Sequence, residues 1–204
     1  PIKGLLVITP DVYKDDRGYF YESFSTKKYA NHGIGSDFVQ DNESYSTYGT
    51  IRGLHFQRGE FAQSKLVRVI EGKILDVAVD LRQSSASFGK WYSIILDDKS
   101  KKQFFIPKGF AHGFSVLSET ARFAYKCDNF YHKESESGIA YDDPALAIDW
   151  MIDAPIVSEK DKVLPRFNNL KTSDLELDWN QFRGSEDPVN NMKDQEKSND
   201  LGSR

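Results

Sequence analysis

"KLVRVIEGKILDVAVDLR", residues Lys65 to Arg82, is the stretch that decides the fold class. Its two apolar runs, Leu66–Ile70 and Ile74–Leu81, are rich in Val and Ile, and "EGK" between them supplies a turn that contains glycine. Because β-branched residues favour strands over helices, we predict that the two runs form a β-hairpin.

Short apolar runs separated by turn residues continue on both sides of this stretch. Helical signals are confined to Thr26–Asn31 and to Val157–Asp161, where Ser158 is placed to cap a first turn. Many short strands at such spacing predict a mostly β protein, a sandwich or barrel with a few short helices. The further strands that we predict are Leu5–Ile8, Tyr19–Phe24, Phe38–Ser44, Thr50–Phe56, Trp91–Leu96, Gln103–Ile106, His112–Val116 and Arg122–Asn129.

Length and composition restrict the class of protein. With 204 residues we predict one domain over 1–183, followed over 184–204 by a polar tail whose Asp, Asn, Ser and Lys content predicts disorder. A formal net charge of -4 argues against a basic surface for nucleic acid. No apolar run approaches the roughly 20 residues of a membrane span, and no signal-peptide pattern is visible. We therefore expect a cytoplasmic protein that binds neither nucleic acid nor membrane.

Two histidines lie in motifs with metal-ligand spacing. Gly49, five residues and then His55 resemble the opening of the first cupin motif, and "PKGFAH", Pro107–His112, resembles the second. This resemblance implies a double-stranded β-helix, a small jelly-roll barrel. A metal-binding cupin usually has a second histidine two residues after the first, where this chain has Gln57. Since an amide oxygen is a poor ligand for a transition metal, we expect no metal and look for another role for His55.

The surroundings of His55 favour a functional role over that of a buried, hydrogen-bonded core histidine. Arg52 and Arg58 flank it, and Lys65 follows nearby. Simple alternation along a strand sends Arg52 and His55 to opposite faces, because they are an odd number of residues apart. We predict that Gly53 forms a bulge that brings both side chains to one face.

A narrower resemblance extends over most of the chain. The blocks that carry it run in order from about Gly4 to Asp161: "DDRGYFYESF", "VQDNESYS", "IRGLHFQ", "AQSKLVRVIEGKILDVAVDLR", "SFGKW", "IPKGFAHGFSVLSE", "AYKCDNFY" and "SEKD". Together they resemble the dTDP-4-dehydrorhamnose 3,5-epimerase family. Two positions depart from the pattern: Glu43 stands where the family commonly has histidine, and Tyr13 where it often has phenylalanine.

The resemblance implies inversion at C3 and C5 of a dTDP-linked 4-keto-6-deoxyhexose through an enolate, without metal or other cofactor. Its implied catalytic residues are His55 as base, Asp161 as the acid that orients it, Lys65 for the enolate oxygen and Tyr125 as proton donor. An imidazole titrates near neutral pH, and a positioned base typically contributes about 10²–10⁴-fold to the rate. A cation beside the enolate oxygen stabilises charge as it develops.

Further positions implied by the resemblance bind the substrate. They are Tyr13, Arg17, Glu22, Gln40, Asn42, Arg52, His112, Tyr131, Glu136 and Lys160. Arginine suits the diphosphate, because its planar fork donates paired hydrogen bonds. The segment with Arg17 and Glu22 is expected to reach the site of the partner subunit, which implies a homodimer. Three alternatives stay open: an epimerase of C3 only or C5 only, a metal-dependent cupin oxygenase, and a non-catalytic sugar-nucleotide binder.

Overall fold

The structure is a computed structural model that describes residues 2–35 and 37–175. The chain divides into two compact units, one of residues 1–23 and 38–177 and one of 24–37 and 178–204. In the described part of the second unit, α1 (Thr26–Ala30) begins after Ser25, whose Oγ accepts a hydrogen bond from the backbone N–H of Lys28. This confirms the helix predicted near Thr26, whereas the predicted tail over 184–204 lies outside the described residues.

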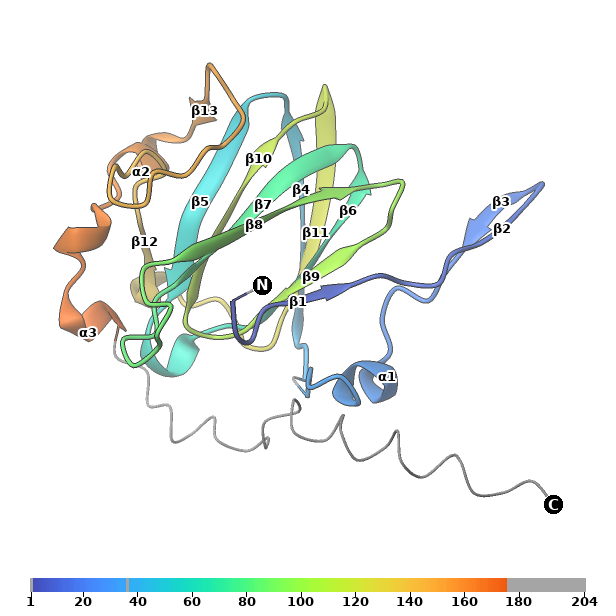
Figure 1. Cartoon of the computed structure of the whole chain (residues 1–204), viewed down its shortest axis with the longest axis horizontal. Helices are drawn as coiled ribbons and strands as arrows, with labels where there is room; N and C mark the ends of the chain where they lie inside the picture. Colours follow the sequence, from blue (N-terminus) through green and yellow to red (C-terminus); the bar gives the residue numbers. More distant parts are fainter. Residues whose placement is uncertain (1, 36, 176–204) are drawn as a thin grey trace. The chain divides into compact units, whose positions relative to one another are not determined.

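Two sheets, antiparallel except for one short parallel strand pair, make up most of the first unit and face each other in Figure 1. The five-stranded sheet has the order β1 (Leu6–Ile8), β9 (Gln103–Ile106), β6 (Lys65–Glu71), β11 (Thr120–Cys127) and β4 (Gln40–Thr47). The six-stranded sheet has the order β12 (Glu136–Gly138), β5 (Thr50–Gln57), β10 (Phe110–Val116), β7 (Lys73–Asp80) and β8 (Trp91–Asp97), and β13 (Ile156–Val157) pairs with β5. This arrangement confirms the prediction of a mostly β, jelly-roll barrel.

The main core lies between the two sheets. Residues at every second position of the facing strands are buried there, including Val67 and Val69 of β6, Ala78 of β7, and Phe104 of β9. This is the expected result of side chains that alternate between the two faces of a strand. Phe114 and Phe123 of this core also line the cavity described below.

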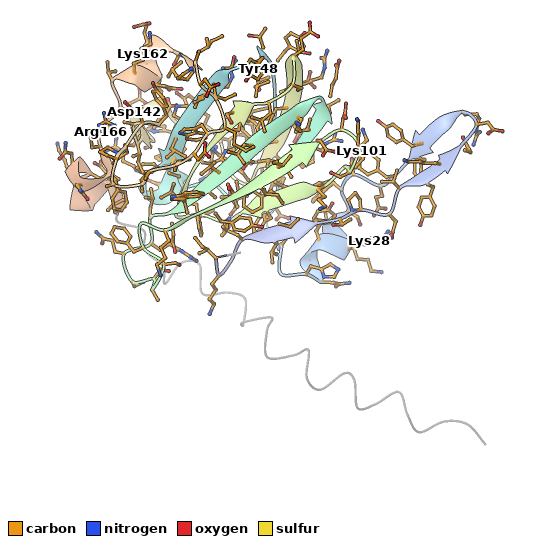
Figure 2. All side chains as sticks on the ribbon, turned by 45° about the horizontal axis from the view of Figure 1, so that its top comes forward. Lys28, Tyr48, Lys101, Asp142, Lys162 and Arg166 are labelled. Carbon is orange, nitrogen blue, oxygen red and sulfur yellow. The ribbon has the colours of Figure 1, made fainter. Side chains whose placement is uncertain are left out.

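A second apolar layer covers the outer face of the six-stranded sheet. Leu75, Val77 and Val79 of β7 pack there against Leu146 and Trp150 of the segment that follows β12. That segment carries α2 (Glu159–Lys162), a 3₁₀ turn over Phe167–Asn169 and α3 (Thr172–Leu175), whereas the 3₁₀ turns over Gly59–Phe61 and Lys133–Ser135 lie earlier in the chain. Within this segment, Arg166 forms an ion pair with Asp142 at 2.7 Å, and both residues are labelled in Figure 2. Both faces of β7 are therefore buried.

The predicted hairpin over Leu66–Leu81 is wrong. β6 and β7 are strands, but β6 pairs with β9 and β11 whereas β7 pairs with β8 and β10, in the other sheet. The chain changes sheet at Gly72, which has φ +87° and where a Cβ would lie 2.2 Å from the carbonyl oxygen of Thr120. A tight glycine turn thus passes the chain across the core instead of folding it back on itself.

The strand predicted over Tyr19–Phe24 is only partly correct. β3 (Gly18–Phe20) ends earlier and pairs with β2 (Tyr13–Asp15), a strand that the apolar pattern did not indicate. The aromatic side chains of this hairpin are exposed, with 67% of Tyr13 and 71% of Phe20 accessible. Its sequence therefore lacks the alternation of apolar and polar residues by which a half-buried strand is recognised. We call residues 13–20 the arm. The other predicted strands differ from the observed ones only at their ends.

Candidate active site

A cavity of about 650 Å³ lies in the first unit, between the two sheets. A smaller hollow of about 250 Å³ adjoins it, because Asn42, His55, Lys65 and Tyr125 line both. The main cavity is further lined by Glu43, Ser44, Thr50, Ile51, Arg52, His112, Gly113, Phe114, Phe123, Ile156, Val157, Ser158, Lys160 and Asp161, and the smaller hollow by Gln40, Phe56, Gln57, Gln63, Tyr131 and Glu136. Three of the four predicted catalytic residues thus lie where the two spaces meet.

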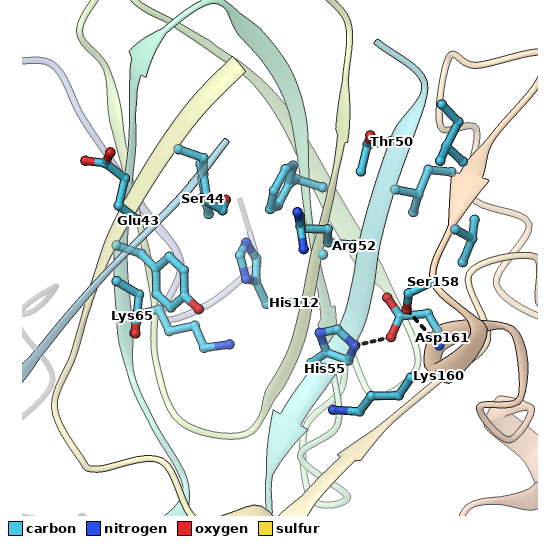
Figure 3. A pocket seen from close by; sticks show the side chains of 18 residues that line it. Glu43, Ser44, Thr50, Arg52, His55, Lys65, His112, Ser158, Lys160 and Asp161 are labelled. Carbon is cyan, nitrogen blue, oxygen red and sulfur yellow. Dashed lines mark hydrogen bonds and ion pairs between the residues drawn. The ribbon is translucent and has the colours of Figure 1, made fainter. Parts of the chain in front are cut away.

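His55 and Asp161 form a hydrogen-bonded dyad. The Nε2 atom of His55, on β5, lies 2.7 Å from Oδ1 of Asp161, on α2 (Figure 3). Asp161 is buried, and its Oδ2 accepts a hydrogen bond from the N–H of Gly53 at 3.3 Å. Burial alone raises the pKa of Asp161, but the bonds from His55 and Gly53 outweigh it and lower this pKa below its usual value. Asp161 is therefore an anion at neutral pH, and His55 Nε2 is the donor.

The strand pairing explains how two residues so distant in sequence meet. β13 runs parallel to β5, with Ile156 opposite Thr50 and Val157 opposite Ile51. α2 begins directly after β13, and Ser158 caps it by accepting a hydrogen bond from the Asp161 N–H at 3.1 Å. This confirms the helical turn predicted at Val157–Asp161 and places the carboxylate beside β5.

The bulge predicted at Gly53 is confirmed. Along the shared ladder, His112 is opposite His55 while Phe114 is opposite Arg52, so β5 holds one more residue than β10 over this interval. Gly53 has φ +121°, and a Cβ on it would lie 2.6 Å from Cα of Gly113. Arg52 and His55 consequently face the same cavity. The Nε atom of Arg52 donates to Ser46 Oγ at 3.1 Å, which orients the guanidinium.

His112, another residue that lines the cavity, forms a second histidine–carboxylate pair. His112 Nε2 is 3.0 Å from both carboxylate oxygens of Asp76, which is fully buried on β7. Burial is the main cause of both pKa shifts, raising the pKa of Asp76 and lowering that of His112. Sequence reasoning missed Asp76. The signal that was available is an acid at an inward position of the otherwise apolar run "ILDVAV".

Lys65 and Tyr125 face the dyad from the five-stranded sheet. Lys65 Nζ lies 5.7 Å from the centre of the Tyr125 ring, and Figure 3 shows the Lys65 side chain reaching into the space that His55 and His112 also border. Burial lowers the pKa of Lys65 and raises that of Tyr125. Tyr125 consequently keeps its proton at neutral pH, as a proton donor requires.

The smaller hollow is bordered by a connected polar group. Glu136 Oε2 accepts hydrogen bonds from the Tyr131 hydroxyl at 2.7 Å and from Lys160 Nζ at 2.5 Å. The bond to Glu136 raises the pKa of Tyr131 to about 12. Gln40 Oε1 accepts from the Tyr131 N–H at 3.0 Å, and Gln40 Nε2 donates to Asn42 Oδ1 at 3.1 Å. All five of these residues were predicted to bind substrate.

Gln57 occupies the position that a metal-binding cupin gives to its second ligand. Its Oε1 accepts a hydrogen bond from the backbone N–H of His132 at 3.4 Å, so the amide supports the loop that carries Tyr131. Among residues 2–35 and 37–175, no group of three or more His, Cys, Asp or Glu side chains is placed to hold a metal ion.

Three predicted substrate-binding residues do not reach the cavity within one chain. Tyr13 and Arg17 lie on the arm, and the Arg17 side chain is 90% exposed while bonded to Asp15 at 2.5 Å. Glu22 follows the arm and lines neither hollow. Glu43, the departure noted in the sequence, pairs with Arg122 at 2.9 Å.

Comparison with known proteins places this chain in a family. A sequence model described as dTDP-4-dehydrorhamnose 3,5-epimerase matches residues 1–169. The chain belongs to this family. The enzymes of that name from Methanothermobacter thermautotrophicus and Escherichia coli are each 52% identical to it. The match with the first enzyme covers 79% of this chain and 88% of that enzyme. The match with the second covers 80% of this chain and 89% of that enzyme.

Solved structures of the epimerase family share the fold. A dTDP-6-deoxy-D-glucose-3,5-epimerase from Legionella pneumophila, in complex with dTDP-4-keto-L-rhamnose, is 51% identical with a TM-score of 0.80, covering 82% of this chain and 89% of that one. A 3'-monoepimerase from Streptomyces bikiniensis, in complex with dTDP-quinovose, is 27% identical with a TM-score of 0.81, covering 89% and 92%. Within the described part of the chain, no helix has the length and apolar character needed to cross a membrane.

Proposed function

We propose that the protein inverts C3 and C5 of dTDP-4-dehydro-6-deoxy-D-glucose, giving dTDP-4-dehydro-L-rhamnose for dTDP-L-rhamnose biosynthesis. The observation that carries this proposal is the His55–Asp161 hydrogen bond of 2.7 Å at a cavity whose opposite wall holds Lys65 and Tyr125. Membership of the family and about 52% identity to two enzymes of that name support it.

His55 is the base in this proposal. Its Nε2–H donates to the Asp161 carboxylate, so Nδ1 carries the lone pair that removes the proton from a carbon next to the C4 ketone. The carboxylate orients the ring and stabilises the imidazolium that forms. Asp161 is suited to this because its lowered pKa keeps it charged at neutral pH.

Lys65 and Tyr125 complete the reaction from the other wall. Negative charge moves to the C4 oxygen as the enolate forms, and the Lys65 ammonium stabilises it; removing one comparable oxyanion donor elsewhere costs roughly 2.7–4 kcal/mol. Tyr125, whose pKa is raised by burial so that it starts each inversion as a phenol, then gives its proton to the opposite face of the carbon. Proton exchange with solvent restores the neutral His55 and the phenol before the second inversion. The His112–Asp76 pair borders the same space and hydrogen-bonds the sugar.

Arg52 and the polar group of Gln40, Asn42, Tyr131, Glu136 and Lys160 bind the nucleotide. The arm and the residues directly after it supply Tyr13, Arg17 and Glu22 to a second copy of the chain in a homodimer. Two features of the arm support this: its aromatic side chains are exposed, and Arg17 faces solvent in the single chain. Large exposed apolar surface of this kind is typical of protein interfaces.

The experiment that tests the function is incubation of the protein with dTDP-4-keto-6-deoxyglucose in D₂O, followed by NMR. Deuterium at both C3 and C5 is the expected result. Deuterium at one carbon only would identify a monoepimerase. This is the second candidate function, and the 27% identical 3'-monoepimerase of the same fold supports considering it. Deuterium at neither carbon would refute both. Chelator in a parallel sample distinguishes a metal-dependent activity.

A further inference from the structure

The inner face of β4 carries a row of polar side chains against the cavity. Inward and outward positions alternate along this strand, and Gln40, Asn42, Ser44 and Ser46 are the less exposed set. Three of the four have hydrogen-bond partners in the protein: Gln40 bonds Asn42 and Tyr131, and Ser46 bonds Arg52. Polar residues on the core side of a strand need such partners to offset the loss of water.

Ser44 is the exception in this row. Its Oγ is buried, and among the described residues it has no hydrogen-bond partner. Its backbone is paired with Phe123 of β11, so the strand itself does not require the hydroxyl. A buried hydroxyl without a partner is destabilising, and an alanine would fit the strand without that cost. The side chain nevertheless lines the cavity, where Figure 3 labels Ser44.

The neighbours of Ser44 indicate the kind of group it binds. Ser46, the next inward residue on β4, accepts a hydrogen bond from Arg52 Nε at 3.1 Å, and Ser44 and Arg52 both line the cavity, so a cation shares this cavity with the Ser44 hydroxyl. The carboxylates that line this cavity are already paired, Asp161 with His55 and Glu43 with Arg122. A hydroxyl donor that shares a cavity with an arginine, without an unpaired carboxylate in the lining, suits an anion with several acceptor oxygens.

We propose that Ser44 donates a hydrogen bond from Oγ to a diphosphate oxygen of the nucleotide sugar, beside Arg52. This rests on the proposed function, because it takes a dTDP-linked sugar as the ligand. Ser44 and Arg52 then act as one diphosphate clamp that Ser46 keeps in register. This hydrogen bond to the ligand would also explain why β4 has a serine at a position where an apolar residue is compatible with the sheet.

The test compares Ser44→Ala with wild type for two ligands in the intact protein. Calorimetry with dTDP should give a Kd about 10- to 150-fold higher for the variant, the size expected for one hydrogen bond to a charged acceptor. NMR titration with thymidine, which lacks phosphate, should give equal affinities. Ser44→Thr keeps the hydroxyl and should restore dTDP binding, and Ser93→Ala on β8, outside the cavity lining, is the matched control.

The unliganded melting temperature separates ligand binding from a structural role. Ser44→Ala should melt no lower than wild type, because it removes a hydroxyl that no protein group satisfies. Unchanged dTDP affinity, an equal loss for thymidine, or a lower melting temperature would each overturn the proposal. Failure of the wild-type protein to bind dTDP would instead refute the proposed function itself.

Discussion

Replacement of Asp161 by asparagine tests the dyad most directly. The two side chains have nearly the same shape, so the buried site keeps its packing while the negative charge is lost. Hydrogen bonds to charged groups contribute about 1.5–3 kcal/mol, which corresponds to a fall in kcat of roughly 10- to 150-fold.

The geometry predicts a loss at or above the upper end of that range. The Gly53 N–H needs an acceptor, so the asparagine oxygen will face Gly53 and its amide NH₂ will face His55 Nε2. Nε2 must then accept, which places the imidazole proton on Nδ1, the atom that has to remove a proton from the substrate. Such a reversed tautomer in a serine protease triad lowers kcat about 10⁴-fold.

The assay is the initial rate of deuterium incorporation into dTDP-4-keto-6-deoxyglucose, with dTDP affinity measured in parallel. Asp161→Asn should lose turnover at both carbons and bind dTDP within about twofold of wild type, since only kcat depends on the dyad. Glu159→Gln neutralises an exposed acid on the same helix and should be fully active. A kcat for Asp161→Asn within threefold of wild type would refute the base assignment.

Four further predictions follow from other parts of the structure. Tyr125→Phe should retain exchange in D₂O yet lose net inversion, because only return from the opposite face requires the phenol; normal product formation by NMR would contradict this. Gly53→Ala, whose Cβ would lie 2.6 Å from the β10 backbone, should lower the free energy of unfolding in urea by about 2–4 kcal/mol, whereas Gly35→Ala meets nothing within 4 Å. The pKa of Asp80 is lowered by its hydrogen bonds to Arg82 and two serines, despite burial. Its contribution to stability is therefore present above the unfolded pKa of about 3.9 and is lost as pH falls. In Asp80→Asn the free energy of unfolding in urea should fall less steeply with decreasing pH than in wild type, and an unchanged pH dependence would contradict this. Arg17→Ala should raise the KM of a dimer without disturbing His55, and full activity on dilution to monomer would refute the arm exchange.

Much of the fold could be predicted from residue type and spacing. Runs rich in Val and Ile placed the strands correctly, because pleated, half-buried surfaces favour such residues wherever they pair. Pairing itself was not predictable: Gly72 was compatible with a hairpin turn, and only the tertiary packing sends β7 to the other sheet. β13 was missed because two residues carry no periodic signal.

The candidate site divides in the same way. Motif spacing indicated His55 and His112, and Gly53 between Arg52 and His55 predicted a bulge that the ladder confirms. Asp76 escaped because its partner lies diagonally across a strand pair, a relation set by register and absent from linear sequence. The roles of these residues in catalysis stay predictions, as does the arm's place in a second subunit.

The parallel pairing of β13 with β5 means that the parts of the site are synthesised at different times. His55 leaves the ribosome 106 residues before Asp161, and Lys65 and Tyr125 also precede it. A nascent chain can therefore close both walls of the barrel while its histidine still lacks an orienting carboxylate. Under the proposed mechanism, turnover requires this short strand to dock beside β5, because only then does Asp161 reach His55.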